Sequence, residues 1–250
     1  MILLVTPTSA IQSEKRIIVA LDVESAAHAR GVVDELREDA AAFKIGLQLF
    51  TAAGPEFVRE LASEHRIFLD LKFHDIPNTV AKAAVEAARL GVWMFNVHVS
   101  GGSEMMRRTV NDVREACERE DRNRPLVIGV TVLTSSDANT LREVGIESTA
   151  EAQVVHLASL AAKCELDGVV ASPLEIAGIR STVGNPNFLI VAPGVRPEFA
   201  TNDDQKRVMS PRRAAAEGAD YLVIGRPILE ANDRRSALRH ISDEIDAADK

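Results

Sequence analysis

The chain alternates short apolar runs with longer amphipathic stretches from about residue 16 onward. Eight of the short runs are predicted as strands, and each is followed by a helical stretch. The strands lie near residues 16–22, 42–46, 66–73, 94–99, 125–132, 168–172, 188–194 and 221–226. Typical helical stretches are 25–38, 55–65, 79–90, 103–120, 150–164 and 211–217. This alternation predicts an α/β fold in which parallel strands close into a (β/α)8 barrel, the TIM barrel.

One domain accounts for the chain. With 250 residues the chain can bury a full core, and no linker is visible, so we expect the barrel to span residues 15–250. A hydrophobic content of 46% with only 4% aromatic residues indicates an interior of Ala, Val, Leu and Ile. Residues 1–14 have an apolar start but neither the basic region nor the apolar length of a signal peptide, so we predict a flexible arm.

Charge and composition exclude several classes of partner. The formal net charge of −8 makes a nucleic acid a poor candidate, because a polyanion would be repelled. No apolar run approaches the roughly 18 residues of a membrane span. The two cysteines, Cys117 and Cys164, form no CxxC motif and are predicted to be free thiols in a reducing compartment, so we expect a cytoplasmic protein.

The predicted strand 66–73 carries an acid and a base in an otherwise apolar run. Asp70 and Lys72 are two positions apart, so they share one face of the strand. Ionised groups in a core strand are costly unless they are paired, which indicates that these residues and the nearby Asp75 form an organised site. The alternative is a salt bridge at the strand end, with Asp75 capping a helix that Pro77 helps to start.

Other charged and polar residues also fall at the predicted strand ends. Barrel enzymes place their catalytic groups at the carboxyl ends of the strands and in the loops that follow. The residues that obey this rule here are Asp22, Lys44, Asp70, Lys72, Thr134, Arg196 and Arg226. Scattered structural charges would have no reason to follow the rule, so we expect one site at one rim of the barrel.

Segments in and around these positions resemble the motifs of the orotidine 5'-phosphate decarboxylase family, in that family's order. They are Ala20-Leu21-Asp22, Phe43-Lys44-Ile45-Gly46, Asp70-Leu71-Lys72-Phe73-His74-Asp75-Ile76-Pro77-Asn78-Thr79, Val130-Thr131-Val132-Leu133-Thr134-Ser135, Ala192-Pro193-Gly194-Val195-Arg196-Pro197, Asp204-Gln205-Lys206-Arg207 and Ile224-Gly225-Arg226-Pro227. The resemblance implies decarboxylation of orotidine 5'-phosphate to UMP. No cofactor fingerprint is visible, so we expect a reaction without a cofactor.

The resemblance implies the catalytic roles. Lys72 would stabilise the carbanion that forms at C6 and then protonate it, with Asp70, Asp75 and Lys44 completing an alternating charge network. The neighbouring carboxylates would keep Lys72 protonated despite burial. The resemblance also implies a homodimer, in which Asp75 and Thr79 enter the site of the other subunit.

Substrate-binding roles are implied in the same way. Asp22 and Lys44 resemble the family's ribose contacts, and Thr134 its contact with the pyrimidine. Their alternatives are a strand-end cap, a snorkelling lysine and a turn hydroxyl. The phosphate would be bound by Arg196, the Gly225 N–H and Arg226, where barrel phosphate sites recur. The long polar stretch 194–209 is predicted to be a closing lid, from which Gln205 would bridge phosphate and base.

Two rival functions stay open at this point. The first rival is a sister barrel enzyme that binds Mg2+, such as a hexulose-phosphate synthase or a keto-gulonate-phosphate decarboxylase. Those families have a Glu-x-Gly pattern at the end of the second strand, where this chain has Lys44-Ile45-Gly46. A charged lysine cannot ligate Mg2+. The histidines His28, His65, His156 and His240 show no ligand spacing, so we predict no metal. The other rival is a noncatalytic sensor of a phosphate ligand, which would not need the buried Lys and Asp array.

Overall fold

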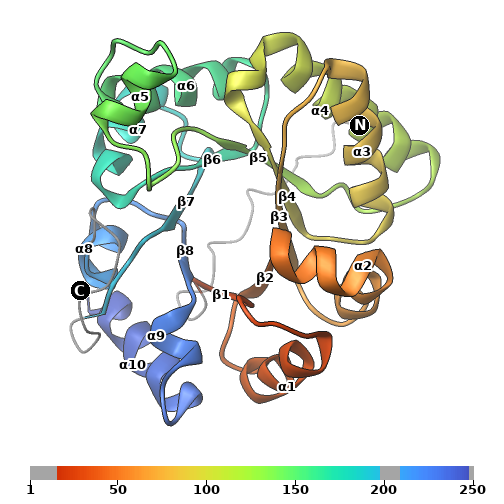
Figure 1. The fold of residues 1–250 in the computed structure, drawn as a ribbon, viewed down its shortest axis with the longest axis vertical. Coiled ribbons are helices and arrows are strands. Elements are labelled where there is room, and N and C mark those ends of the chain that lie inside the picture. Colours follow the sequence, from red (N-terminus) through yellow and green to blue (C-terminus); the bar gives the residue numbers. More distant parts are fainter. Residues whose placement is uncertain (1–15, 198–208, 248–250) are drawn as a thin grey trace, which may run out of the picture.

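The computed structural model describes residues 16–197 and 209–247 of the chain. Within them, eight parallel strands close into a barrel in sequence order, and β8 pairs with β1 (Figure 1). The strands are β1 (Ile17–Ala20), β2 (Ala42–Gly46), β3 (Ile67–Phe73), β4 (Met94–His98), β5 (Leu126–Val130), β6 (Gly168–Val170), β7 (Leu189–Pro193) and β8 (Tyr221–Ile224). The predicted (β/α)8 barrel is therefore confirmed, and the predicted arm at 1–14 lies outside the described residues.

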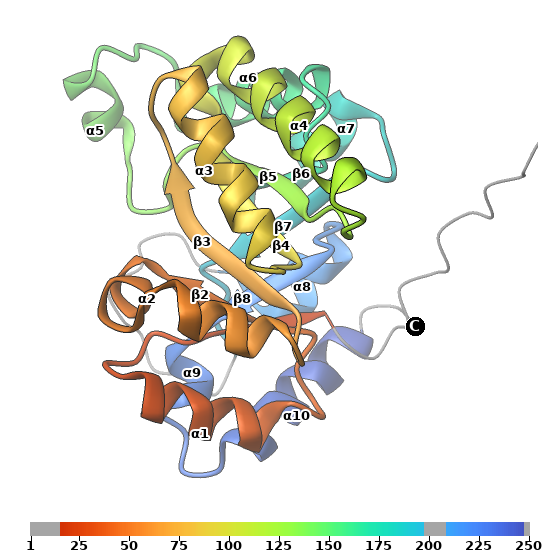
Figure 2. The same ribbon diagram turned by 90° about the vertical axis from the view of Figure 1, so that its right-hand side faces the viewer.

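Helices surround the barrel and cover the outer face of its strands (Figures 1 and 2). They are α1 (Ala26–Leu36), α2 (Leu47–Ala62), α3 (Pro77–Arg89), α4 (Gly102–Arg119), α5 (Ala138–Glu143), α6 (Ala150–Lys163), α7 (Ile176–Val183), α8 (Pro211–Ala216), α9 (Arg226–Leu229) and α10 (Arg234–Asp246), with 3-10 turns at Val99–Gly101 and Pro173–Glu175. None of the described helices is both long enough and apolar enough to cross a bilayer.

One helix starts earlier than the sequence pattern predicts. The expected helix at 55–65 is the second part of α2, which begins at Leu47 and is broken by the left-handed backbone of Gly54, at φ 77°. Pro55 follows this break, and proline is well suited to the first turn of a helix, which is why the pattern placed a start there. The first part of α2 follows β2 directly and so lies next to the mouth of the barrel.

The core has two layers, which follow from the alternation of side chains along each strand. Residues such as Ile17, Val19 and Leu21 of β1 and the turn after it point outward and pack under the helices. Their alternates fill the inside of the barrel, namely Ile18, Ala20, Ala42, Phe68, Met94, Ile128, Val191, Tyr221 and Val223. Aliphatic residues dominate both layers, as the composition predicts.

The inner layer determines which residues face the mouth of the barrel. Since side chains alternate with a period of 2, the residue two positions beyond an inner one points inward as well. Lys44 follows Ala42 in this way, and Asp70 follows Phe68. The barrel therefore places the charged side chains of Lys44 and Asp70 directly above the apolar residues that fill its interior.

Candidate active site

A pocket of about 270 Å³ opens at the carboxyl ends of the strands. Its described lining comes from the ends of every strand except β4 and from the loops that follow them. The predicted site residues in the lining are Asp22, Lys44, Asp70, Lys72, Thr134, Arg196, Gly225 and Arg226. These residues lie far apart in the sequence, and the barrel brings all of them to one rim.

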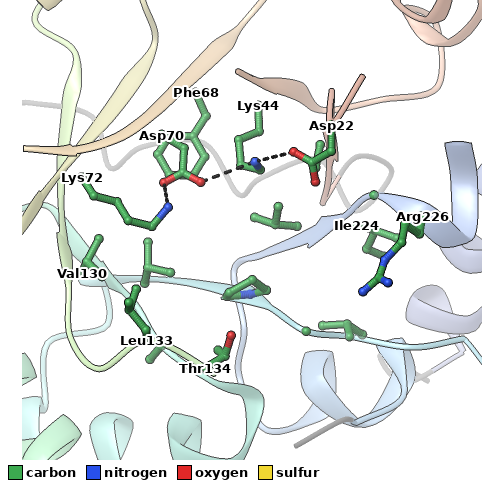
Figure 3. A pocket seen from close by; sticks show the side chains of 18 of the residues that line it. Asp22, Lys44, Phe68, Asp70, Lys72, Val130, Leu133, Thr134, Ile224 and Arg226 are labelled. Carbon is green, nitrogen blue, oxygen red and sulfur yellow. Dashed lines mark hydrogen bonds and ion pairs between the residues drawn. The ribbon is translucent and has the colours of Figure 1, made fainter. Parts of the chain in front are cut away.

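Four side chains form an unbroken row of alternating charge along one wall of the pocket (Figure 3). Lys44 Nζ lies 3.2 Å from Asp22 Oδ1 and 3.4 Å from Asp70 Oδ2. The other oxygen of Asp70, Oδ1, lies 2.7 Å from Lys72 Nζ. Each inner charge thus has an opposite charge on both sides, which is what a charged group needs when it leaves water.

Burial within this row is uneven. The Lys44 and Asp70 side chains are 11% and 13% exposed, whereas that of Lys72 is 36% exposed. Burial favours the neutral form of Asp70, but the charges of Lys44 and Lys72 and the hydrogen bonds from Lys72 and Asn96 outweigh it and hold the pKa of Asp70 below its ordinary value. Asp70 is therefore a fixed anion that holds Lys72 at the pocket surface.

The backbone at Lys72 departs from regular strand geometry. Lys72 has a φ of 54°, in the left-handed region that side chains other than glycine rarely adopt. The register between β3 and β4 shifts here, since Leu69 pairs with Phe95 but Phe73 pairs with Val97. A non-glycine residue in this region costs about 1–2 kcal/mol. Such irregularities in a strand re-aim side chains and are common next to active sites.

Asn96 is a site residue that the sequence analysis missed. Its side chain is buried on β4, where it accepts a hydrogen bond from the Lys72 backbone N–H at 2.8 Å and donates one to Asp70 Oδ1 at 2.7 Å. The available signal was a single amide inside the apolar run Met94-Phe95-Asn96-Val97-His98, two residues beyond the inward-facing Met94.

Two arginines also line the pocket. Arg196 follows β7, and Arg226 begins α9 one residue after the end of β8. Figure 3 shows Arg226 beyond Asp22 in the row of charges, and Thr134 across the pocket from Lys44. A Cβ added at Gly225 would lie 3.3 Å from Asp22 Oδ2 and 3.4 Å from Ala20 Cβ, so a larger residue would crowd this part of the pocket.

Apolar side chains complete the lining. They include Phe68, Val130, Leu133, Val170 and Ile224. The arrangement fits a ligand that places an anionic group toward Arg226 and polar groups toward the row of charges.

Two predicted site residues lie elsewhere. Asp75 and Thr79 are exposed, on the loop after β3 and in the first turn of α3, and neither lines the pocket of its own chain. The Asp75 carboxylate accepts a hydrogen bond from the adjacent Ile76 N–H at 2.6 Å. Ile76 is itself the N-cap residue of α3, so Asp75 is not the helix cap that was its alternative interpretation. Gln205 and most of the predicted lid at 194–209 lie outside the described residues.

Aromatic rings pack against one another beside the site and inside the barrel. His74 and His98 stack with ring centroids 5.3 Å apart beside the site, and burial, His74 and Lys72 together lower the pKa of His98. Trp93 packs edge-on against Tyr221. Among the residues that the structure describes, no group of three or more His, Cys, Asp or Glu side chains is arranged to hold a metal ion.

Comparisons of the sequence with known proteins point to one family. The chain matches the model of the "Orotidine 5'-phosphate decarboxylase / HUMPS family" over residues 15–241. It is 54% identical to an orotidine 5'-phosphate decarboxylase of Geobacter sulfurreducens, over 94% of this chain and 97% of that one. It is 52% identical to one of Moorella thermoacetica, over 94% of each chain.

Solved structures show the same likeness. Orotidine 5'-phosphate decarboxylase from Lactobacillus acidophilus superimposes with a TM-score of 0.80 at 34% identity, covering 92% of this chain and 98% of that one. An uncharacterized conserved protein from Geobacillus kaustophilus gives a TM-score of 0.79 at 36% identity, with coverages of 92% and 99%.

Proposed function

The chain belongs to the orotidine 5'-phosphate decarboxylase / HUMPS family and converts orotidine 5'-phosphate to UMP, and we propose that Lys72 supplies both the cation and the proton for this reaction. The observation that carries the proposal is the row Asp22, Lys44, Asp70 and Lys72, in which the more exposed ammonium group, that of Lys72, lies at the pocket surface and is paired with the buried carboxylate of Asp70.

The chemistry requires such a group. When the bond from C6 to the carboxylate breaks, its electron pair stays on C6 in the plane of the ring, where the carbonyl groups cannot delocalise it. A fixed ammonium group beside C6 stabilises that charge in the transition state, because it needs no reorganisation at the moment of reaction. A proton of Lys72 Nζ then moves to C6, CO2 leaves, and the neutral amine regains a proton from solvent.

No cofactor is needed in this scheme. Lys44 also argues against the magnesium-dependent rival, because its ammonium group lies between the carboxylates of Asp22 and Asp70, where a divalent cation would otherwise have to sit. The noncatalytic rival would have no use for a buried carboxylate that holds a lysine at the pocket surface.

The rest of the pocket would bind the substrate. Arg196, the Gly225 N–H and Arg226 would take the phosphate dianion at the ends of β7 and β8. Asp22 and Lys44 would bind the ribose hydroxyls, and Thr134 the pyrimidine. Gln205, which lies outside the described residues, would join phosphate and base.

We further propose a homodimer in which Asp75 and Thr79 complete the site of the partner subunit. Both residues are exposed near the mouth of the barrel, and Ile76 between them is an apolar side chain that is 66% exposed. A surface of this kind is suited to contact with another chain. A cytoplasmic location fits the two buried free cysteines, Cys117 and Cys164.

A spectrophotometric assay tests the proposal. The loss of orotidine 5'-phosphate is followed by ultraviolet absorbance, with and without EDTA, for the wild type and for Lys72→Ala. Lys163→Ala is the matched control, since Lys163 is an exposed lysine on α6, far from the pocket. We expect wild-type and control activity in EDTA and almost none for Lys72→Ala. Activity that EDTA abolishes and Mg2+ restores would support the rival enzyme instead.

A further inference from the structure

We propose that Asn96 is the positioning residue of this site, because its carboxamide locks Lys72 and Asp70 together from the neighbouring strand. The inference rests on the proposed role of Lys72 and extends it. Asn96 does not line the pocket, so it would act through Lys72 and not through the substrate.

The orientation of the Asn96 amide follows from its partners. A backbone N–H can only donate, so the atom that faces the Lys72 N–H at 2.8 Å must be the carbonyl oxygen Oδ1. The amide nitrogen Nδ2 then faces Asp70 Oδ1 at 2.7 Å, where an ionised carboxylate can only accept. Both partners are thus fixed by chemistry, and one side chain bridges two residues of β3.

Because Asn96 is buried, loss of either of its hydrogen bonds would destabilise the folded protein. Asn96 is 1% exposed, and its neighbours Phe95 and Val97 on β4 are fully buried. A buried amide without partners is strongly unfavourable, so an asparagine at this position must keep its hydrogen bonds. An apolar residue would fit the rest of β4 equally well, which indicates that the amide serves the site.

The bridge supports the unusual backbone at Lys72. Between the paired positions Leu69–Phe95 and Phe73–Val97, four steps along β3 correspond to two along β4. The Lys72 N–H is therefore out of register with the β4 backbone, and Asn96 Oδ1 accepts its hydrogen bond instead. The left-handed Lys72 backbone is held in place by a side chain.

The same bridge decides which Asp70 oxygen faces which lysine. Asp70 Oδ1 accepts from both Asn96 Nδ2 and Lys72 Nζ, and this leaves Oδ2 to face Lys44 at 3.4 Å. Without Asn96 the carboxylate could rotate, and the ammonium group of Lys72 could move with it. A displacement of about 1 Å in a reacting group can cost on the order of 100-fold in rate.

The test compares Asn96→Ala and Asn96→Asp with Thr109→Val. Thr109 is a fully buried residue on α4 whose hydroxyl donates to the Met105 carbonyl at 2.8 Å, so its substitution removes a buried hydrogen bond that involves neither Lys72 nor Asp70. For each variant, kcat, KM, the Kd of UMP and the melting temperature are measured. Asn96→Ala should lower kcat by about 100-fold and leave the Kd of UMP within about threefold, whereas Thr109→Val should lower only the melting temperature.

Asn96→Asp gives a signature that a merely structural residue would not produce. The introduced carboxyl keeps an acceptor for the Lys72 N–H, but when ionised it faces Asp70 Oδ1 with a second negative charge. Two close carboxyls share a proton, so acidification should protonate the introduced group and let it donate to Asp70. Its kcat relative to wild type should therefore rise as the pH falls.

Clear outcomes would overturn the proposal. It is wrong if Asn96→Ala keeps more than a third of wild-type kcat, or if kcat and UMP affinity fall together. If Asn96→Ala does not fold, the Asn96→Asp variant decides. A ratio of its kcat to the wild-type kcat that stays constant across pH would contradict the proposal. If Lys72→Ala is itself active, the proposed function has failed and not this extension alone.

Discussion

Asp70 and Lys72 form a 2.7 Å ion pair from positions only two apart on the same strand. In a regular strand both side chains would stand side by side and point into the barrel. Here the left-handed backbone of Lys72 turns its ammonium group back onto the carboxylate of Asp70 and toward the pocket. The irregularity in β3 therefore accompanies an ammonium group that is anchored at the surface of the pocket.

Lys72→Ala should lower kcat by at least about 10³-fold, because the variant loses both charge stabilisation and the proton donor. The fold should survive, since the Lys72 side chain is partly exposed and its removal leaves Asp70 paired with Lys44. Steady-state kinetics and circular dichroism check both points, with Lys163→Ala as control. A variant that keeps more than about a tenth of wild-type kcat, a barrier change under about 1.4 kcal/mol, would rule out Lys72 as the key acid.

Asp70 should contribute to stability in a pH-dependent way. Its pKa in the folded protein is lowered, so the ionised carboxylate stabilises the fold above the ordinary value of 3.8, and the contribution is lost as the pH falls through the lower folded-state pKa. The difference in unfolding free energy between wild type and Asp70→Asn should therefore be constant from about pH 7 to 5 and shrink below about pH 4.

Urea denaturation at several pH values measures that difference. Asp112→Asn is the control, because Asp112 pairs with Arg108 on α4 at 3.7 Å and does not line the pocket. A difference for Asp70→Asn that widens on acidification would contradict the lowered pKa.

Arg226→Ala should weaken binding only of ligands that carry a phosphate. Arg226 lies at the end of the pocket opposite Lys72, so its loss should raise the Kd of UMP by about 10- to 100-fold, the worth of one or two charge-assisted hydrogen bonds. The Kd of uridine should not change. Isothermal titration with both ligands checks this, and an equal loss for UMP and uridine would place Arg226 at another part of the substrate.

The sequence could predict the barrel and most of the site for a physical reason. The periodicity of apolar residues in strands and helices can be recognised within a short stretch of sequence. A charged residue such as Lys44 in an apolar strand can be recognised in the same way. Asn96 was missed because one amide in a strand is weak evidence, and its importance comes from the register shift beside Lys72, which arises only when β3 pairs with β4. Likewise the start of α2 at Leu47 was hidden by Gly54.

The proposed dimer makes the most specific prediction. If Asp75 completes the Lys72 network of the partner subunit, Lys72→Ala and Asp75→Asn homodimers should each be almost inactive. A mixed dimer carries both changes in one site and neither in the other. With equal amounts and random exchange, half the dimers are mixed and each has one intact site, so activity should return to about a quarter of wild type per subunit.

The decisive control is the mixture of Lys72→Ala with Asp70→Asn. Both of these residues line the pocket of their own chain, and their side chains form an ion pair there. A mixed dimer of these two variants therefore has one change in each site and no intact site, so mixing should restore nothing. Native mass spectrometry establishes that mixed dimers have formed in both experiments. If the Lys72→Ala and Asp75→Asn mixture also stays inactive, Asp75 acts within its own chain and the two subunits do not share a site.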